Sequence, residues 1–158
     1  MKKAIFLLCA ILMVTGIEAA GANKMTIDIN IGVLTDKDLS FSPIFWSLGA
    51  ELDIPLGKIM FISPELLFVS YKFKFENFLV FPGALLNVKL GSFFVGGGAT
   101  KAFYLAGGTM TEIPDAFFLK VNAGLMSESL KITAYIDTPF TDEAFKDFVF
   151  GITLGFRL

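Results

Sequence analysis

Residues 148–158 alternate between two kinds of side chain, and this alternation constrains the fold more than any other feature of the sequence. Apolar side chains occupy every second position, at Phe148, Phe150, Ile152, Leu154, Phe156 and Leu158. The residues between them are mostly small or polar and include one cation, Arg157. A repeat of two residues is that of a β-strand, whose side chains point alternately to opposite faces. The segment therefore predicts a strand whose two faces meet very different surroundings.

The start of the chain has the three-part pattern of a secretory signal peptide. Two lysines precede an uncharged run at 4–17, and Ala20 and Ala22 match the A-x-A rule for cleavage before Asn23. Cleavage after Ala20 is the alternative. An uncleaved anchor is disfavoured, because a spanning helix needs about 20 apolar residues. We therefore expect residues 1–22 to be a signal peptide that takes no part in the fold.

Residues 23–158 are expected to form one domain, and their composition excludes several functions. This part of the chain contains neither cysteine nor histidine, which excludes disulfides, thiolate or imidazole metal sites and histidine-dependent triads. No cofactor or metal is expected. Removing the three charged residues of the signal peptide from the totals of 13 basic and 15 acidic residues leaves 11 and 14, a net charge of −3. This balance does not favour nucleic acid, which selects basic patches.

The chain is rich in apolar residues but has no stretch that could cross a membrane as a helix. Hydrophobic residues make up 54% of the sequence, yet the longest uncharged stretches after the signal peptide, 39–50 and 77–88, are 12 residues each. In lipid every backbone polar group needs a partner within the protein, so the remaining spanning architecture is a closed barrel.

Alternating segments of about ten residues recur along the chain, which is the length that a tilted strand needs to cross the hydrocarbon. The expected strands are 25–34, 45–55, 59–71, 77–89, 93–105, 117–125, 130–137 and 148–158. The expected connections are longer and polar at 35–43, 72–76, 106–115 and 138–144, and short at 57, 91 and 127. We therefore predict an all-β fold, an eight-stranded antiparallel up-and-down transmembrane barrel.

Two local features complicate the pairing of these strands. The glycines at 96–98 remove the alternation from the fifth strand and leave its phase open. Pro64 and Pro82 cannot donate a ladder hydrogen bond, so we expect a bulge or weak pairing near them.

The phase of the strands predicts which side chains face the lumen. The polar face is rich in glycine, which suits a crowded tube, whereas the bulky apolar face suits lipid. A soluble cup with its apolar face inside is disfavoured, because it would turn these bulky residues inward. The charged residues predicted to face the lumen are Asp28, Glu51, Asp53, Glu65, Lys89, Lys101, Lys120, Lys131 and Arg157. Buried charges must be paired, so we expect a salt-bridged plug, with a narrow polar path as the alternative.

The apolar alternation at 148–158 resembles the C-terminal insertion signal of bacterial outer-membrane β-barrels, although Leu158 stands where that signal ends in an aromatic residue. The architecture resembles the small eight-stranded outer-membrane barrels, such as the membrane domain of outer membrane protein A and the opacity-like surface proteins. This resemblance implies an outer-membrane location, contact with outer-membrane lipids, and assembly by periplasmic chaperones and the barrel-assembly machinery. Roles in this group range from envelope integrity to surface contact.

Three functions follow from this resemblance, in order of preference. The first is a non-enzymatic integral barrel, the second a narrow pore or small-solute conduit, and the third a lipid-modifying enzyme. Lipid A deacylases of this size use a histidine-assisted serine, and this chain has no histidine. Ser47, Ser63 and Ser70 are therefore expected to be wall residues, and Glu51 and Asp53 to be ion-pair partners.

Overall fold

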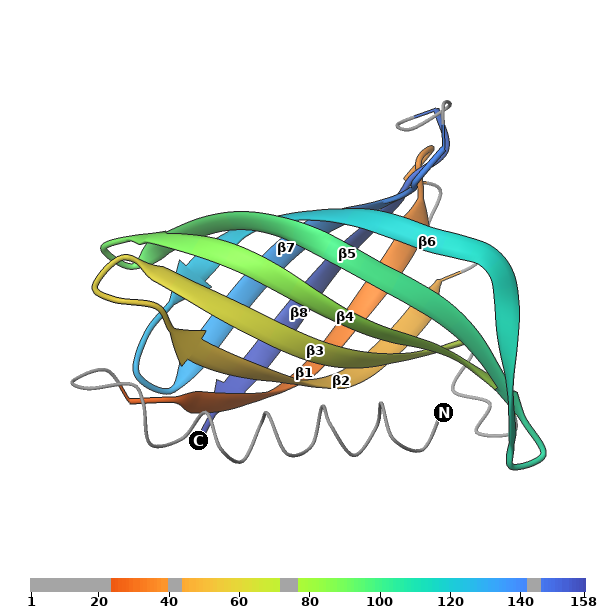
Figure 1. The fold of residues 1–158 in the computed structure, drawn as a ribbon, viewed down its shortest axis with the longest axis horizontal. Helices are drawn as coiled ribbons and strands as arrows, with labels where there is room; N and C mark the ends of the chain where they lie inside the picture. The colour runs from red at the N-terminus through yellow and green to blue at the C-terminus, as the bar shows by residue number, and fades with distance from the viewer. Residues whose placement is uncertain (1–23, 40–43, 72–76, 142–145) are drawn as a thin grey trace.

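The computed structural model describes residues 24–39, 44–71, 77–141 and 146–158. They form a closed antiparallel barrel in which each strand pairs with the next along the chain (Figure 1). The strands are β1 (Thr26–Asp36), β2 (Phe45–Pro55), β3 (Met60–Tyr71), β4 (Asn77–Leu90), β5 (Phe93–Ala106), β6 (Thr109–Met126), β7 (Leu130–Pro139) and β8 (Val149–Arg157). In the described part of the chain, no helix has the length and apolar character to cross a membrane. The predicted eight-stranded up-and-down barrel is confirmed.

The barrel closes where the first and last strands pair. β1 and β8 are antiparallel over nine residue pairs, from Asp28 opposite Arg157 to Asp36 opposite Val149. Closure leaves no strand with unpaired backbone groups at an edge. We call the end where β1 begins and β8 ends the terminal end, and the opposite end the loop end. The turns at the terminal end are short, as predicted.

The two faces of the wall differ as the alternation predicted. In β1, Asp28 is fully buried in the lumen, whereas the next residue, Ile29, points outward and is 41% exposed. The same apolar exterior continues around the barrel, with Leu48, Leu86, Val121 and Ile132 among its exposed side chains. This outer surface is an apolar band. Exposing it to water would cost free energy, whereas contact with lipid would not.

The phase of β5, which the sequence left open, is set by close packing against β4. Phe94, Thr100 and Ala102 are buried and face inward. Gly98 shares this inward face, and a Cβ there would collide with the backbone oxygen of Ala84. The glycines therefore serve the close approach of two strands, which explains why they interrupt the alternation.

The prediction of a polar loop at 106–115 is wrong. β5 continues to Ala106 and β6 begins at Thr109, joined by a two-residue turn at Gly107 and Gly108. Both glycines have positive φ, 55° and 79°, as a tight hairpin turn of this length requires. This hairpin extends beyond the rim at the loop end (Figure 1), and the register of β5 against β6 shifts between Lys101 and Phe103.

The bulge expected near the prolines is absent from the β3–β4 hairpin. Its register is unbroken, with Pro64 opposite Ala84 and Pro82 opposite Leu66. The pairing is interrupted instead on the other side of β3, where no partners join β2 and β3 between Glu51–Glu65 and Ile54–Ile62. The missing N–H group of Pro64 thus weakens the ladder to the neighbouring hairpin without shifting the register. The predicted loop at 72–76 lies outside the described residues, as do 40–43 of the loop predicted at 35–43 and 142–144 of the loop predicted at 138–144. The first residues of these two segments belong to strands, because β1 continues to Asp36 and β7 to Pro139.

Candidate functional site

An ionic network fills the lumen near the terminal end, and Lys131 is at its centre. The Lys131 Nζ atom lies 2.9 Å from Glu51 Oε1, 2.9 and 3.0 Å from the two carboxylate oxygens of Asp53, and 3.7 Å from Asp28 Oδ2. Asp28 lies opposite Glu51 in the β1–β2 ladder, whereas Lys131 reaches both from β7. All four side chains are buried, so each charge depends on the others for compensation.

Arg157 ties this network to the seam of the barrel. Its Nε lies 3.1 Å from Asp28 Oδ1 on the adjoining strand β1, and its Nη2 donates to Asp53 Oδ2 on β2 at 2.9 Å. Its Nη1 donates to the backbone oxygen of Ser127 at 3.4 Å. One side chain of the last strand therefore binds the first two strands and the β6–β7 turn. We refer to Asp28, Glu51, Asp53, Lys131 and Arg157 as the ionic network.

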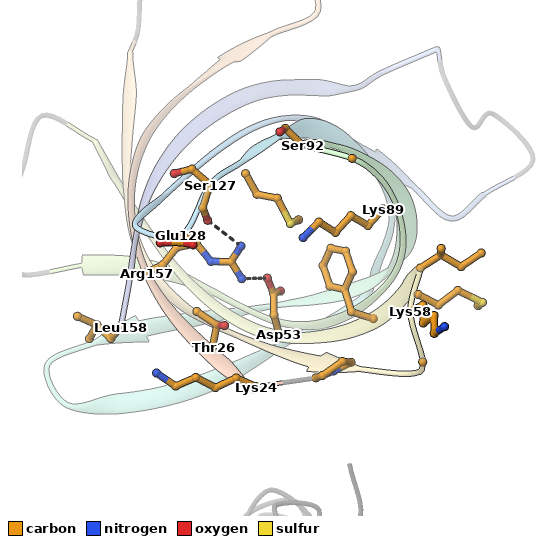
Figure 2. Close-up of a pocket in the computed structure, with 17 residues that line it drawn as sticks. Lys24, Thr26, Asp53, Lys58, Lys89, Ser92, Ser127, Glu128, Arg157 and Leu158 are labelled. Carbon is orange, nitrogen blue, oxygen red and sulfur yellow. Dashed lines mark hydrogen bonds and ion pairs between the residues drawn. The ribbon is translucent and has the colours of Figure 1, made fainter. Parts of the chain in front are cut away.

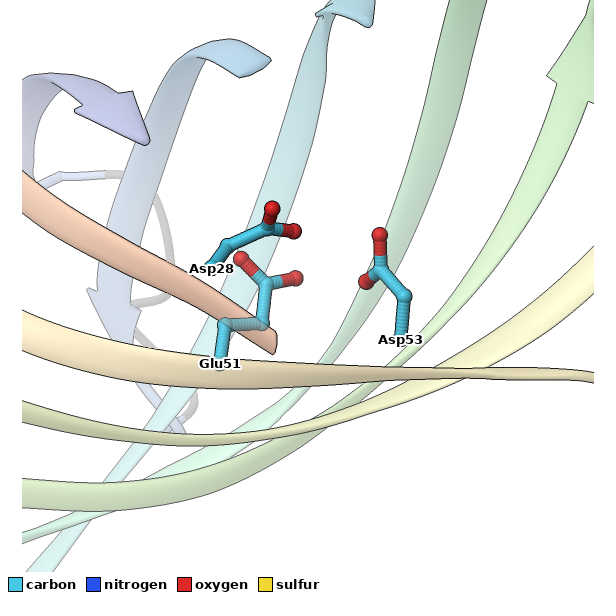
Figure 3. A group of neighbouring side chains, drawn as sticks. All are labelled: Asp28, Glu51 and Asp53. Atoms are coloured by element: carbon cyan, nitrogen blue, oxygen red, sulfur yellow. The ribbon is translucent and has the colours of Figure 1, made fainter. Parts of the chain in front are cut away.

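The three carboxylates of the network resemble a cation site at first sight. One oxygen each of Asp28, Glu51 and Asp53 lies within 4.8 Å of the others (Figure 3), and hard cations prefer such oxygen ligands. The ammonium group of Lys131 already lies among these oxygens, however, and Arg157 binds two of the three carboxylates. The donor set therefore fits an internal lysine better than a metal ion.

A second ion pair lies nearer the loop end. Lys120 Nζ on β6 donates to both carboxylate oxygens of Glu65 on β3, at 2.7 and 2.8 Å, and lies 4.1 Å from the centre of the Tyr135 ring. Asp137, opposite Lys120 in the β6–β7 ladder, is also buried. Sequence reasoning omitted Asp137 from the lumen charges, although a period of two from Lys131 places both on one face of β7.

One of the predicted lumen charges lies on the outer face, and another lies at the mouth of the barrel. Lys101 is on the outer face of β5, where it pairs with Glu112 and its Nζ lies 4.6 Å from the Phe117 ring centre. Its placement in the lumen was wrong because the glycines hid the phase of β5. Lys89 is on the inward face of β4 but is exposed at the mouth of the barrel.

The corrected lumen has an excess of negative charge. Among the described residues, its buried charges are Asp28, Glu51, Asp53, Glu65, Asp137, Lys120, Lys131 and Arg157. Five acids thus face three bases, where the sequence predicted four acids and five bases.

Two groups of large apolar side chains also occupy the lumen, and the sequence analysis missed both. The loop-end cluster consists of Leu34, Leu67, Val69 and Tyr135. The terminal-end cluster consists of Phe61, Phe94 and Met126, and the Lys131 Nζ atom lies 5.1 and 4.9 Å from the two phenylalanine ring centres. These clusters lie on the two sides of the polar middle of the tube.

Polar side chains connect the ionic network to the middle of the lumen. Ser63 donates a hydrogen bond to Asp53 Oδ1 at 2.7 Å, and Asn87 Nδ2 donates to Ser63 Oγ at 2.9 Å. These two hydrogen bonds extend the ionic network along the lumen.

The vestibule is a cavity of about 590 Å³ at the terminal end, outside the terminal-end cluster. Phe61, Met126, Asp53 and Arg157 line its inner part, and Lys89 points from the wall toward the interior of the barrel (Figure 2). Within the described residues, this is the concave surface that a soluble ligand could enter from the terminal end.

The predicted insertion signal lies on β8 as expected for an outward face. Ile152, Leu154 and Phe156 are exposed to the exterior, whereas Phe150 is partly buried among its neighbours. Phe148 and Leu158 flank the strand, which spans Val149–Arg157. The predicted cleavage site, Ala22 and Asn23, and the signal peptide at 1–22 are not tested, because residues 1–23 lie outside the described part.

Comparison with solved structures finds the same fold in natural and designed transmembrane barrels. A de novo designed transmembrane β-barrel has a TM-score of 0.58 at 10% identity, covering 84% of this chain and 95% of the designed one. Neisserial surface protein A (NspA) has a TM-score of 0.56 at 11% identity, covering 85% of this chain and 94% of that protein. By its fold, the chain is a small eight-stranded transmembrane β-barrel.

A third similar barrel has a different kind of function. The outer membrane enzyme PagL has a TM-score of 0.51 at 13% identity, covering 83% of this chain and 98% of that protein. At these identities the likeness concerns the fold alone. No protein-family model matches the chain, and no curated protein is significantly similar to it in sequence.

Proposed function

We propose that the protein is an integral barrel of the bacterial outer membrane that is neither an enzyme nor an open pore, with an envelope-structural or surface-contact role. The observation that carries this proposal is the combination of an apolar exterior with a lumen closed by the ionic network and two apolar clusters. A closed tube leaves the outer surface and the two ends of the barrel as the parts that can act.

The outer-membrane location and its partners belong to the same proposal. The apolar exterior would contact the acyl chains of outer-membrane lipids. The alternation of β8 supports assembly by periplasmic chaperones and the barrel-assembly machinery, and the natural barrels NspA and PagL share the fold.

The chemistry of the lumen supports a non-enzymatic role. Ser47 and Ser63 are buried in the wall, and the Ser63 hydroxyl is bound to Asp53. The chain has no histidine to act as a general base for a serine. The likeness to PagL brings no site residue with it.

A narrow pore is the second candidate, because the polar middle of the lumen and the vestibule could form parts of a path for solutes. The loop-end cluster opposes this reading, since the side chains of Leu67 and Tyr135 face the lumen and are 5% and 2% exposed. A hydrophobic constriction of this kind excludes water and ions.

Two measurements test the proposal. Outer-membrane extracts should contain a protein whose gel mobility changes on boiling, as a folded barrel requires. In planar bilayers the wild type should give no stable channel openings. A heat-modifiable variant with both Phe94→Ala and Tyr135→Ala, which removes a large side chain from each apolar cluster, should show channel openings. Stable openings from the wild type would refute the closed barrel. Recovery of the protein in the soluble periplasmic fraction, without heat modifiability, would refute the membrane location, and altered lipid A acylation in expressing cells would refute the non-enzymatic role.

A further inference from the structure

The vestibule is a cavity formed by the turns of the terminal end and by lumen side chains beneath them. Its walls come from the β2–β3, β4–β5 and β6–β7 turns and from the adjoining ends of β1 and β8. Its inner limit is formed by Phe61 and Met126, which are 6% and 7% exposed. A volume of about 590 Å³ falls within the range of small-molecule sites, which is about 300–1,000 Å³.

Cations dominate the side chains that line this cavity. Four bases, Lys24, Lys58, Lys89 and Arg157, oppose two acids, Asp53 and Glu128. Asp53 is already compensated, since its carboxylate oxygens accept hydrogen bonds from both Lys131 and Arg157.

The three lysines of the vestibule are available to a ligand. Within the described residues, the side chains of Lys24, Lys58 and Lys89 make no hydrogen bond and no ion pair. Figure 2 shows Lys24 and Lys58 at the rim, whereas Lys89 reaches into the mouth of the barrel. A concave, low-dielectric wall that carries one sign of charge concentrates its field on ions of the opposite sign.

The inner end of the vestibule is apolar, which favours a ligand with an apolar part. Phe61 and Met126 offer apolar surface at the inner end of the cavity, below Lys89. Beyond this inner end, the ionic network contains three acids and two bases, so an anion that enters is not drawn farther along the tube.

From this arrangement we propose that the vestibule binds a soluble oxyanion, phosphate or carboxylate, carried on a short apolar chain. The anionic group lies at Lys89, which points into the mouth of the barrel (Figure 2), and the apolar chain packs against Phe61 and Met126. Lysine holds such groups as a compact point charge and does not distinguish the two oxyanions by geometry.

The methionines allow a direct test on the folded protein in a non-ionic detergent. Met126 lines the inner part of the vestibule, whereas Met110 lies far away on the β5–β6 hairpin. Methyl-labelled methionine is observed by NMR during titration with hexyl phosphate. A saturable shift of Met126, without a shift of Met110, is the expected result, and it should weaken as salt is added.

Ligand and protein controls separate this site from general partitioning into the micelle. Hexanol should bind more weakly than hexyl phosphate, because it lacks the charge. Lys89→Gln should raise the dissociation constant about tenfold, the loss of one charge-assisted contact. Lys101→Gln, on the outer face, should leave it unchanged. Each variant is first checked for heat modifiability.

Several outcomes would overturn the proposal. Equal affinity for hexanol, an equal shift of Met110, or unchanged binding by Lys89→Gln would each show that no anion site exists. If hexyl phosphate has no effect but nanodiscs containing phosphatidylglycerol shift Met126, the cations serve a lipid headgroup and the proposed soluble ligand is wrong.

Discussion

Replacing Lys131 by methionine tests the ionic network most directly. The substitution keeps the length of the side chain but removes the ammonium group that lies within 3.0 Å of Glu51 and Asp53. Arg157 would remain as the single cation facing three buried carboxylates. Breaking a buried ion pair on one side costs about 3–5 kcal/mol, a large part of the roughly 5–15 kcal/mol that stabilises a typical domain.

Denaturant titration of the barrel in lipid vesicles measures this loss. The chain has one tryptophan, Trp46, on the outer face of β2, so its fluorescence should change when the strand leaves the lipid. Lys131→Met should lower the free energy of unfolding by about 3–5 kcal/mol. The control Lys101→Met removes a more exposed ion pair on the outer face and should cost about 0–1 kcal/mol.

A second substitution separates loss of charge compensation from loss of packing. Adding Glu51→Gln to Lys131→Met removes one of the carboxylates that lost their cation. The double variant should recover at least about 1 kcal/mol of the free energy of unfolding. A loss below about 1 kcal/mol for Lys131→Met, or no recovery in the double variant, would refute the reasoning that this lysine compensates the carboxylates.

Three further predictions concern the packing and the loops. Gly98→Ala should destabilise the barrel by about 1–3 kcal/mol or prevent heat-modifiable folding, because its Cβ would collide with the neighbouring strand; Gly97→Ala, whose outward Cβ would lie 3.1 Å from the backbone oxygen of Lys120, should cost less. Phe94→Ala empties a fully buried position and should cost about 3–5 kcal/mol in the same denaturant titration, and a cost near zero would contradict the closed terminal end. At the loop end, the hydrogen bond from Lys37 to Asp147, at 2.7 Å, lowers the pKa of Asp147 below its usual 3.8 and raises the pKa of Lys37 above its usual 10.5. Because a lowered carboxyl pKa stabilises the fold above 3.8 and a raised lysine pKa stabilises it below 10.5, this link should be complete from about pH 4 to 10 and be lost outside that window. Amide hydrogen exchange near Asp147 should report the loss at acid pH, and Lys37→Gln should remove the pH dependence.

The sequence predicted the fold because the two faces of the wall differ in most strands. In β1 and β8, outward isoleucine, leucine and phenylalanine alternate with inward polar or small residues, so the phase could be assigned without coordinates. That phase placed Asp28, Glu51 and Lys131 in the lumen, where the structure has them.

The apolar clusters could not be predicted, because there the contrast between the faces disappears. Leu67 and Val69 face the lumen, while the neighbouring Leu66 and Phe68 face outward. When both faces are apolar, a period of two no longer shows which residues fill the tube. The hairpin at 106–115 was missed for the opposite reason: where a hairpin extends beyond the rim, both faces meet water, and polar residues look like a loop.

The length of β6 has a practical consequence. It contains 18 residues, whereas a transmembrane strand needs about 9–11, so about seven residues remain after the crossing. At about 3.3 Å per residue, this surplus projects the Gly107–Gly108 turn on the order of 20 Å from the bilayer. A short affinity tag inserted at that turn would stand clear of the headgroups and report, by antibody access on intact cells, which compartment this end of the molecule faces.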